Sequence, residues 1–204
     1  MTRLETIFEY WFNGLNDRTL IDPDSLPVKR WFSGEAATDR EIRERFEEDH
    51  LRAAREEYKA WEDTPRGRLA LVILLDQFSR NLYRGSPKAF ATDPMALDLC
   101  SRSMEDGFDE PLALIERTFP YMPLMHAESV EMQEKCKQQI SRLVELAKER
   151  SPTNVGHFTY SHEFAVKHAV IIERFGRFPH RNAILGRSST PEEIEFLKGP
   201  DSSF

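Results

Sequence analysis

Cysteine is scarce in this chain of 204 residues, which contains only Cys100 and Cys136. Both lie within helical patterns and far apart, so they do not resemble a disulfide framework or a pair of zinc ligands. We therefore expect two buried thiols in a reducing compartment, and we predict a cytoplasmic location. The N-terminal segment mixes acidic with apolar residues and lacks the small-residue cleavage site of a signal peptide.

Glycine motifs and long apolar runs are missing as well. The 9 glycines form no G-x-G-x-x-G fingerprint, no P-loop and no G-x-S-x-G elbow. This argues against nucleotide-dependent and α/β-hydrolase chemistry, and we expect no cofactor. No run approaches the ~20 apolar residues that span a bilayer, so we expect no membrane partner.

Positive charge is not in excess either. The 28 Lys and Arg residues face 35 Asp and Glu residues, which gives a net charge of −7. The chain therefore lacks the general basic surface that attracts nucleic acids and anionic membranes. We do not expect a nucleic acid as partner.

β-Strand patterns are absent, because no segment combines alternating apolar residues with β-branched enrichment. Apolar residues recur instead at helical spacing, interrupted by glycine, proline and capping residues. We expect helices over residues 4–15, 38–61, 65–84, 93–107, 109–115, 130–148 and 155–175, and a short helix from Thr190. Segments 22–34 and 120–129 are predicted to be linkers. This pattern predicts a single all-α domain over residues 1–204, an orthogonal bundle or short array of antiparallel helix pairs.

The stretch 69–84 is the predicted centre of the fold. It opens with seven consecutive apolar residues, 69–75, and a helix that is apolar on every side has no face left for water. Its second half is polar, so its side chains need partners inside the protein or on a ligand. The candidate site residues here are Asp76, Arg80 and Asn81. Asp76 and Arg80 can pair on one face, either as a buried structural ion pair or as a pair that holds Arg80 towards a cleft.

The second candidate is the cationic segment 174–187, which contains four arginines, one histidine and no acid. Arginine forks match carboxylate or phosphate groups bidentately, so the segment could hold an anion. Alternatively, the arginines pair with acidic helices or cap the C-termini of neighbouring helices. The residues predicted to face a ligand are Arg174, Arg177, His180, Arg181 and Asn182.

The third candidate consists of His126, Glu128 and His168, because histidine and carboxylate side chains can exchange protons or bind a metal. His168 lies near the middle of the apolar side of helix 155–175, where its protonated form would be disfavoured. A satisfied core histidine is the simpler interpretation. No HExxH motif or cysteine pair accompanies this spacing, so no metal site is predicted.

Four segments together carry a family resemblance: DQFSRNLYRG at 76–85, FATDPMAL at 90–97, YMPLMHAES at 121–129 and RFGRFPHRNAILGRSSTPEEIEFL at 174–197. Over nearly its whole length the chain resembles the bacterial domain of unknown function 924, which is grouped with the tetratricopeptide-like helical superfamily. The resemblance implies a tetratricopeptide-like array of helix pairs and no established activity. The motif positions shared with the family are Asp76, Gln77, Arg80, Asn81, Arg84, His126, Glu128, His168, Arg174, Arg177, His180, Arg181 and Asn182.

Three functional hypotheses follow. The favoured one is a binding module whose arginines and histidine hold an anionic small molecule or an acidic peptide. The alternative is an enzyme that orients a small carboxylated or phosphorylated substrate with arginines and exchanges a proton through a histidine, which Glu128 or Asp76 positions. The third is a structural scaffold with internal ion-pair fasteners. Both ligand-binding hypotheses require Arg80 and Arg181 to border one charged hollow, and the oligomeric state is left open.

Overall fold

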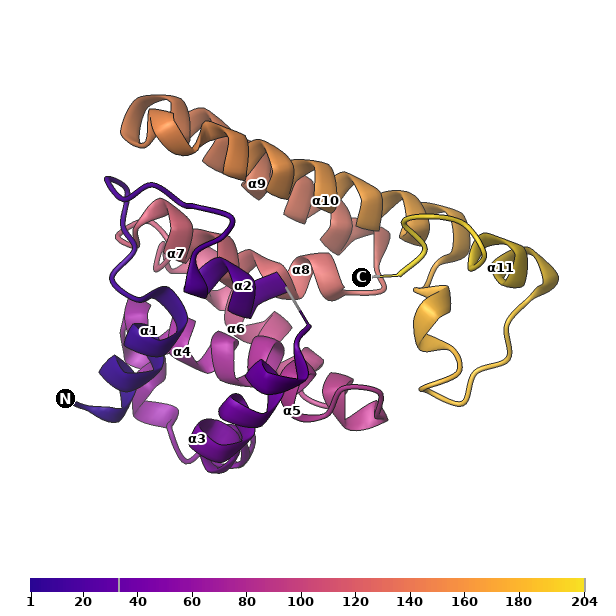
Figure 1. The fold of residues 1–204 in the computed structure, drawn as a ribbon, viewed down its shortest axis with the longest axis horizontal. Helices are drawn as coiled ribbons and strands as arrows, with labels where there is room; N and C mark the ends of the chain where they lie inside the picture. Colours follow the sequence, from indigo (N-terminus) through magenta and orange to yellow (C-terminus); the bar gives the residue numbers. More distant parts are fainter. Residues whose placement is uncertain (33, 204) are drawn as a thin grey trace.

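The computed structural model describes residues 1–32 and 34–203, and every regular element within these ranges is a helix. The predicted all-α class is therefore confirmed, while the tetratricopeptide-like arrangement stays a prediction. The α-helices are α1 Arg3–Phe12, α2 Leu26–Phe32, α3 Ala36–Ala54, α4 Pro65–Val72, α5 Ser79–Leu82, α6 Asp93–Glu105, α7 Leu114–Thr118, α8 Met122–His126, α9 Val130–Arg150, α10 Val155–Phe175 and α11 Pro191–Phe196 (Figure 1). In the described ranges no helix is long and apolar enough to cross a membrane.

Several predicted helix ends agree with the structure because local capping chemistry sets them. The hydroxyl of Thr64 accepts a hydrogen bond from the backbone N–H of Gly67, and Pro65 opens α4. Thr190 forms the predicted capping box with Glu193 at the start of α11. Helix α10 has the predicted bounds and ends at Gly176, whose positive φ of 68° suits glycine.

Other boundaries were predicted wrongly. Helix α3 begins after Glu35 rather than at Thr38, so Thr38 lies inside the helix and caps nothing. The same helix ends at Ala54 instead of near Trp61, and Glu56 has a φ of 58°, which no α-helix continues through.

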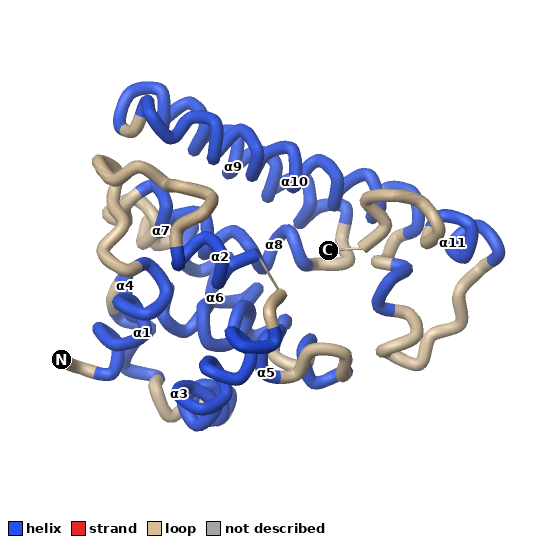
Figure 2. The backbone as a smooth tube through the Cα atoms, viewed as in Figure 1, coloured by secondary structure: helices blue, strands red, loops and turns tan. Residues whose placement is uncertain are grey.

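Two predicted linkers contain helices. The first includes α2, and Ser33 near its end lies outside the described residues. The second contains a 3₁₀ turn, Phe119–Tyr121, followed by α8. The prolines that suggested a linker stand in the first turns of these helices, where their missing N–H is not needed. Similarly, α7 starts at Leu114, after a series of turns over 109–112 (Figure 2).

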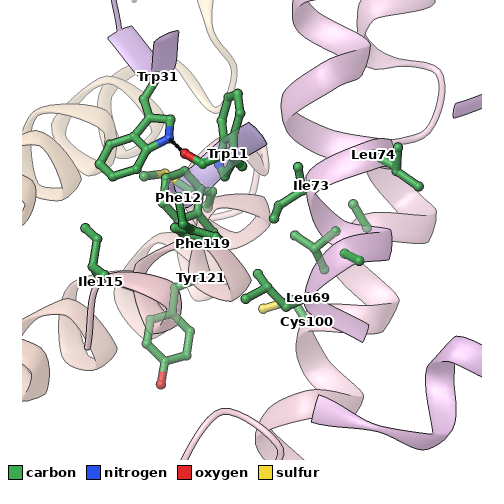
Figure 3. Packing of buried hydrophobic residues seen from close by; sticks show 14 of the residues in the cluster. Trp11, Phe12, Trp31, Leu69, Ile73, Leu74, Cys100, Ile115, Phe119 and Tyr121 are labelled. Atoms are coloured by element: carbon green, nitrogen blue, oxygen red, sulfur yellow. Dashed lines mark hydrogen bonds between the residues drawn. The ribbon is translucent and has the colours of Figure 1, made fainter. Parts of the chain in front are cut away.

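The core confirms the central position of the apolar run, because residues 69–75 are all buried. Aromatic rings from distant segments pack in the same core cluster, among them Trp11, Trp31 and Phe119 (Figure 3). The indole N–H of Trp31 donates to the carbonyl oxygen of Trp11 over 2.9 Å, which satisfies one buried polar group. Cys100 and Cys136 are buried as expected.

One turn of the central helix departs from α geometry. Helix α4 continues directly into a π-helical turn, Ile73–Phe78, and then into α5. A π-helical turn contains one more residue than an α-turn, and such turns occur frequently at functional sites. Asp76 lies within this turn.

The remaining candidate residues lie on α5, on α8 and shortly after it, on α10 and on the segment that follows α10. Helices α9 and α10 lie side by side as an antiparallel hairpin along one side of the molecule (Figure 1). The short helix α8 contacts both α9 and α6. After α10, the chain extends beyond the end of the hairpin and carries α11 at the opposite end of the molecule from α1.

Candidate functional site

A cluster of charged and polar side chains forms where α6, α8 and the segment after α10 meet the central helix. It consists of Asp76, Arg80, Asp93, His126 and Arg181, which we name the polar cluster. Asp93 is the first residue of α6 and His126 is the last residue of α8. Arg181 ends a 3₁₀ turn, Pro179–Arg181. The fold thus brings four distant chain segments to one place.

Asp76 is the fully buried anion of the cluster. Its Oδ1 atom lies 2.8 Å from Nδ1 of His126 and 3.2 Å from a terminal nitrogen of Arg80. Its other oxygen accepts a hydrogen bond of 2.6 Å from the side-chain amide of Gln77. Burial favours the protonated acid, but Arg80 and His126 outweigh burial and lower the pKa of Asp76 to about 2. Asp76 is therefore ionised at neutral pH.

Arg80 connects the central helix to α6. Its two terminal nitrogens donate to the two carboxylate oxygens of Asp93 over 3.0 and 3.1 Å, a bidentate pair. One of them also donates to the backbone carbonyl of Asp76 over 2.7 Å. Arg80 is therefore held between two carboxylates, which fixes its orientation.

His126 uses only one of its ring nitrogens within the cluster. An ionised carboxylate only accepts hydrogen bonds, so the bond to Asp76 requires the proton on Nδ1. Burial and the nearby charge of Arg80 lower the pKa of His126, so the ring is neutral near pH 7 and Nε2 keeps its lone pair. No described residue forms a hydrogen bond with Nε2, and the side chain is 15% exposed.

Arg181 is the least satisfied cation of the cluster. One terminal nitrogen donates to the carbonyl oxygen of His126 over 3.0 Å and lies 4.0 Å from Asp93. Its guanidinium carbon lies 4.8 Å from the ring centre of Phe90 and 4.4 Å from that of Phe178. The Nε atom is buried and has no hydrogen-bond partner among the described residues. Burial and the charge of Arg80 lower the pKa of Arg181 to about 10, so it remains charged at neutral pH.

Other predicted ligand-binding residues are bound to acids of their own. Arg174 pairs with Glu192 at 2.8 Å and Arg177 pairs with Glu193 at 2.7 Å. The side-chain amide of Asn182 donates to Ser189 and to Glu193. These contacts fasten α11 to the segment that follows α10.

Glu128 and Asn81 also point to other partners. Both oxygens of Glu128 accept hydrogen bonds from Arg187, at 2.6 and 2.9 Å, and one accepts from the backbone N–H of Phe178. The amide of Asn81 donates to Asp39 of α3 over 2.8 Å. The structure therefore does not bring these two residues into the polar cluster.

Two further histidines lie beside the cluster. The ring centres of His168 and His126 are 6.5 Å apart, and Nδ1 of His168 lies 2.8 Å from the carbonyl oxygen of Phe164. Burial is the main cause that lowers the pKa of His168 to about 3. Burial, together with the charge of Arg181, lowers the pKa of His180 to about 4. Both rings are neutral at physiological pH.

Sequence reasoning missed Asp93, the carboxylate that joins the two arginines. The sequence around Asp93 predicted only the start of the helix 93–107. Sequence reasoning also missed the two aromatic residues that contact Arg181, namely Phe90 and Phe178. The sequence around an isolated phenylalanine does not indicate which distant residue its ring will contact. The only available hint was that Phe90 and Asp93 belong to one of the four segments that carry the family resemblance.

Two cavities of the molecule lie away from the cluster. One, of about 290 Å³, is lined by apolar residues such as Leu71, Leu75 and Leu99 together with charged residues such as Glu62 and Arg102. The other is lined by Asp17, Arg150 and neighbours of Pro111. Neither cavity lies between Arg80 and Arg181, so the charged hollow that both ligand-binding hypotheses require stays a prediction. In ranges 1–32 and 34–203 no group of three His, Cys, Asp or Glu side chains could hold a metal ion.

The formal charges of the polar cluster balance. Arg80 and Arg181 carry two positive charges, Asp76 and Asp93 carry two negative ones, and His126 is neutral. The cluster therefore has no excess of positive charge. What it can present to a ligand is the hydrogen-bond donors of Arg181 and the proton acceptor Nε2 of His126.

Comparisons with known proteins agree with the fold. A family model described as "Bacterial protein of unknown function (DUF924)" matches residues 7–201. A solved structure of ATU0120, a protein of unknown function from Agrobacterium tumefaciens, is similar with a TM-score of 0.75 and 35% sequence identity. That match covers 96% of this chain and 97% of that chain. A search of proteins with curated functions found no match.

Proposed function

This chain belongs to the bacterial family DUF924, a family of unknown function, and from its own side chains we propose that the polar cluster binds a small oxyanion, a carboxylate or a phosphate. An acidic peptide presents the same carboxylate chemistry. The observation that carries the proposal is the guanidinium of Arg181, which is 6% exposed and has a buried Nε without a hydrogen-bond partner among the described residues. A buried donor without a partner destabilises the protein, and a hydrogen bond from that donor to a ligand oxygen removes this penalty.

The surroundings of Arg181 support a preorganised donor. The rings of Phe90 and Phe178 lie against its guanidinium, which limits its rotation and stabilises the charged form by cation–π attraction. A side chain that is already held in place loses little entropy when a ligand binds. Arg80 shares the carboxylate of Asp93 with Arg181, so a second guanidinium is close to the same position.

The balanced charge of the cluster limits the strength of binding. An incoming anion has to share the arginines with Asp93, so we expect a dissociation constant in the millimolar range, which corresponds to about −4 kcal/mol. The ion pairs of Arg174, Arg177 and Arg187 support the scaffold hypothesis for those three residues alone. We therefore restrict the proposed site to the polar cluster and exclude the rest of the cationic segment.

The test is an NMR titration of the 15N-labelled full chain with sodium phosphate and sodium acetate, read at the arginine Nε–H resonances. We expect a saturable shift of the Arg181 resonance. This resonance is assigned as the one that is missing from the spectrum of the variant Arg181→Lys. Lysine keeps the charge but loses the fork, so Arg181→Lys should weaken binding at least tenfold, as read at the Nε–H resonance of Arg80, which shares Asp93 with residue 181.

Arg174→Ala is the matched control, because Arg174 lies in the same cationic segment and is exposed and paired with Glu192. It should leave binding unchanged. An Arg181 resonance that does not respond to either anion rejects the site. If Arg80→Ala and Arg181→Ala both abolish the helical circular-dichroism spectrum, the fastener hypothesis holds instead.

A further inference from the structure

We propose that His126 is the general base of an esterase: its Nε2 atom takes a proton from a water molecule that attacks a small carboxylic ester held by Arg181. This inference rests on the proposed oxyanion site and adds a reaction to it. The evidence is the arrangement of three groups, namely the buried carboxylate of Asp76, the ring of His126 and the incompletely bonded guanidinium of Arg181.

Asp76 prepares the ring for this role. Its carboxylate accepts the hydrogen bond from Nδ1, which fixes the tautomer with the lone pair on Nε2 and fixes the plane of the ring. When Nε2 takes a proton, the ring becomes an imidazolium beside a buried negative charge, which stabilises it. Asp76 is thus a positioning residue, and His126 is the group that meets the water.

Water is the nucleophile that the structure supports. The two thiols, Cys100 and Cys136, are buried, and burial raises the pKa of each of them. The hydroxyls nearest in sequence to the acidic residues of the cluster are already engaged: Ser79 donates to the carbonyl of Ala89 over 2.9 Å, and Thr92 donates to that of Leu75 over 2.5 Å. In contrast, Nε2 of His126 belongs to a side chain that solvent reaches.

Arg181 supplies the charge that the reaction needs. One of its nitrogens donates to the backbone carbonyl of His126, so the guanidinium lies beside the residue that carries the imidazole. Negative charge develops on the carbonyl oxygen of an ester when water adds to it, and a prepositioned donor stabilises that oxygen. The buried Nε–H of Arg181, which has no partner among the described residues, is such a donor.

The proton and electron pairs balance without a further reactant. The water oxygen forms a bond to the acyl carbon, and the water proton moves to Nε2 of His126. The bond between the acyl carbon and the alcohol oxygen then breaks, and the leaving oxygen receives the proton from His126. The products are an alcohol and a carboxylic acid, whose carboxylate is the kind of anion that Arg181 is proposed to bind.

The experiment measures hydrolysis of 4-nitrophenyl acetate by the full chain, followed as release of 4-nitrophenolate. General-base catalysis typically contributes ~10²-fold or more, so His126→Gln should lower the rate by about 100-fold. Exposed histidines also react slowly with this ester. His162→Gln is the matched control, because His162 lies on α10 outside the cluster and should not change the rate.

Binding of acetate separates failure of this inference from failure of the oxyanion site. We expect His126→Gln to bind acetate with an affinity within about threefold of the wild type, since Arg181 donates to the backbone of residue 126 and not to its ring. If acetate binds and the wild-type protein hydrolyses the ester no faster than His126→Gln, the inference is wrong while the site stands. If acetate does not bind at all, both proposals fail.

A second measurement does not depend on the folding of a variant. Diethyl pyrocarbonate acylates accessible, unprotonated ring nitrogens, and peptide mass spectrometry locates the modified residue. Hydrolysis by the wild-type protein should fall in proportion to modification of His126, and acetate should slow both. Activity that persists after complete modification of His126 overturns the inference.

Discussion

The Nδ1 atom of His126 lies 2.8 Å from Oδ1 of Asp76, although 50 positions of the chain separate the two residues. Asp76 is fully buried, so this contact contributes to the stability of the fold as well as to the protonation of the ring. These two contributions can be separated, because stability and hydrolysis are measured independently.

Asp76→Asn removes a buried charge while it keeps the shape of the side chain. Arg80 then loses one of its two carboxylate partners. A buried cation whose charge is only partly neutralised lowers the stability of the folded protein. We expect the free energy of unfolding to fall by about 3 kcal/mol, measured by urea denaturation at pH 7. Asp98→Asn is the control, because Asp98 is an exposed residue of α6 that pairs with Arg102. It should change stability by less than about 0.5 kcal/mol, and equal effects of the two variants would contradict a buried role for Asp76.

The buried ring of His168 makes stability depend on pH. Its pKa is about 3 in the folded protein and 6.5 for an ordinary histidine, so between these values the unfolded chain binds the additional proton. The contribution of His168 to the free energy of unfolding is therefore fully present above pH 6.5 and is lost as the pH falls towards 3. Each bound proton contributes a slope of about 1.4 kcal/mol per pH unit.

His168→Met removes this titrating group and keeps an apolar side chain of similar length. Between pH 7 and pH 5, unfolding by urea should show that the variant loses about 2 kcal/mol less than the wild-type protein. This pH range lies above the range in which Asp76 changes its charge. The control His162→Gln should follow the wild-type protein, and identical losses for His168→Met and the wild type would refute the assignment.

Two glycines offer a matched test of backbone packing. A Cβ atom on Gly67 would meet the backbone carbonyl of Trp61 and lie 2.7 Å from the hydroxyl of Thr64, whereas one on Gly156 would meet nothing within 4 Å. Gly67→Ala should therefore destabilise the protein by about 2 kcal/mol or more, because backbone has to move. Gly156→Ala in α10 should stabilise it by about 0.5 kcal/mol through reduced entropy of the unfolded chain. Thermal unfolding measures both, and a neutral Gly67→Ala would show that the cap at Thr64 adapts.

The fold was largely predictable because its signals are local. The apolar run 69–75 predicts a buried helix. The spacing of apolar residues in 155–175 predicts a second helix, and Gly176 predicts where that helix ends. Segment 120–129 was wrongly predicted to be a linker because its prolines were interpreted as helix breakers. Proline is also a good residue for the first turn of a helix, and that is its role here. Local sequence does not distinguish these two roles of proline.

The candidate site was predictable only in part. Asp76, Arg80, His126 and Arg181 do lie together, whereas Arg174, Arg177 and Glu128 are bound elsewhere. Nothing within a segment tells which acid an arginine will meet, because the partners lie up to 133 positions apart, as Arg150 and Asp17 do. The role of Asp93 was hidden for the same reason.

The π-helical turn at Ile73–Phe78 takes up one more residue than an α-turn within the same full rotation of the helix. The extra residue is therefore absorbed locally, and Arg80 keeps the angular position that it would have on a regular helix one residue shorter. Each residue of a regular α-helix advances the chain by about 100° around the axis. An insertion after the turn, between Phe78 and Arg80, would therefore rotate the Arg80 side chain by that angle, away from Asp93, whereas deletion of one residue within the turn would leave its direction nearly unchanged.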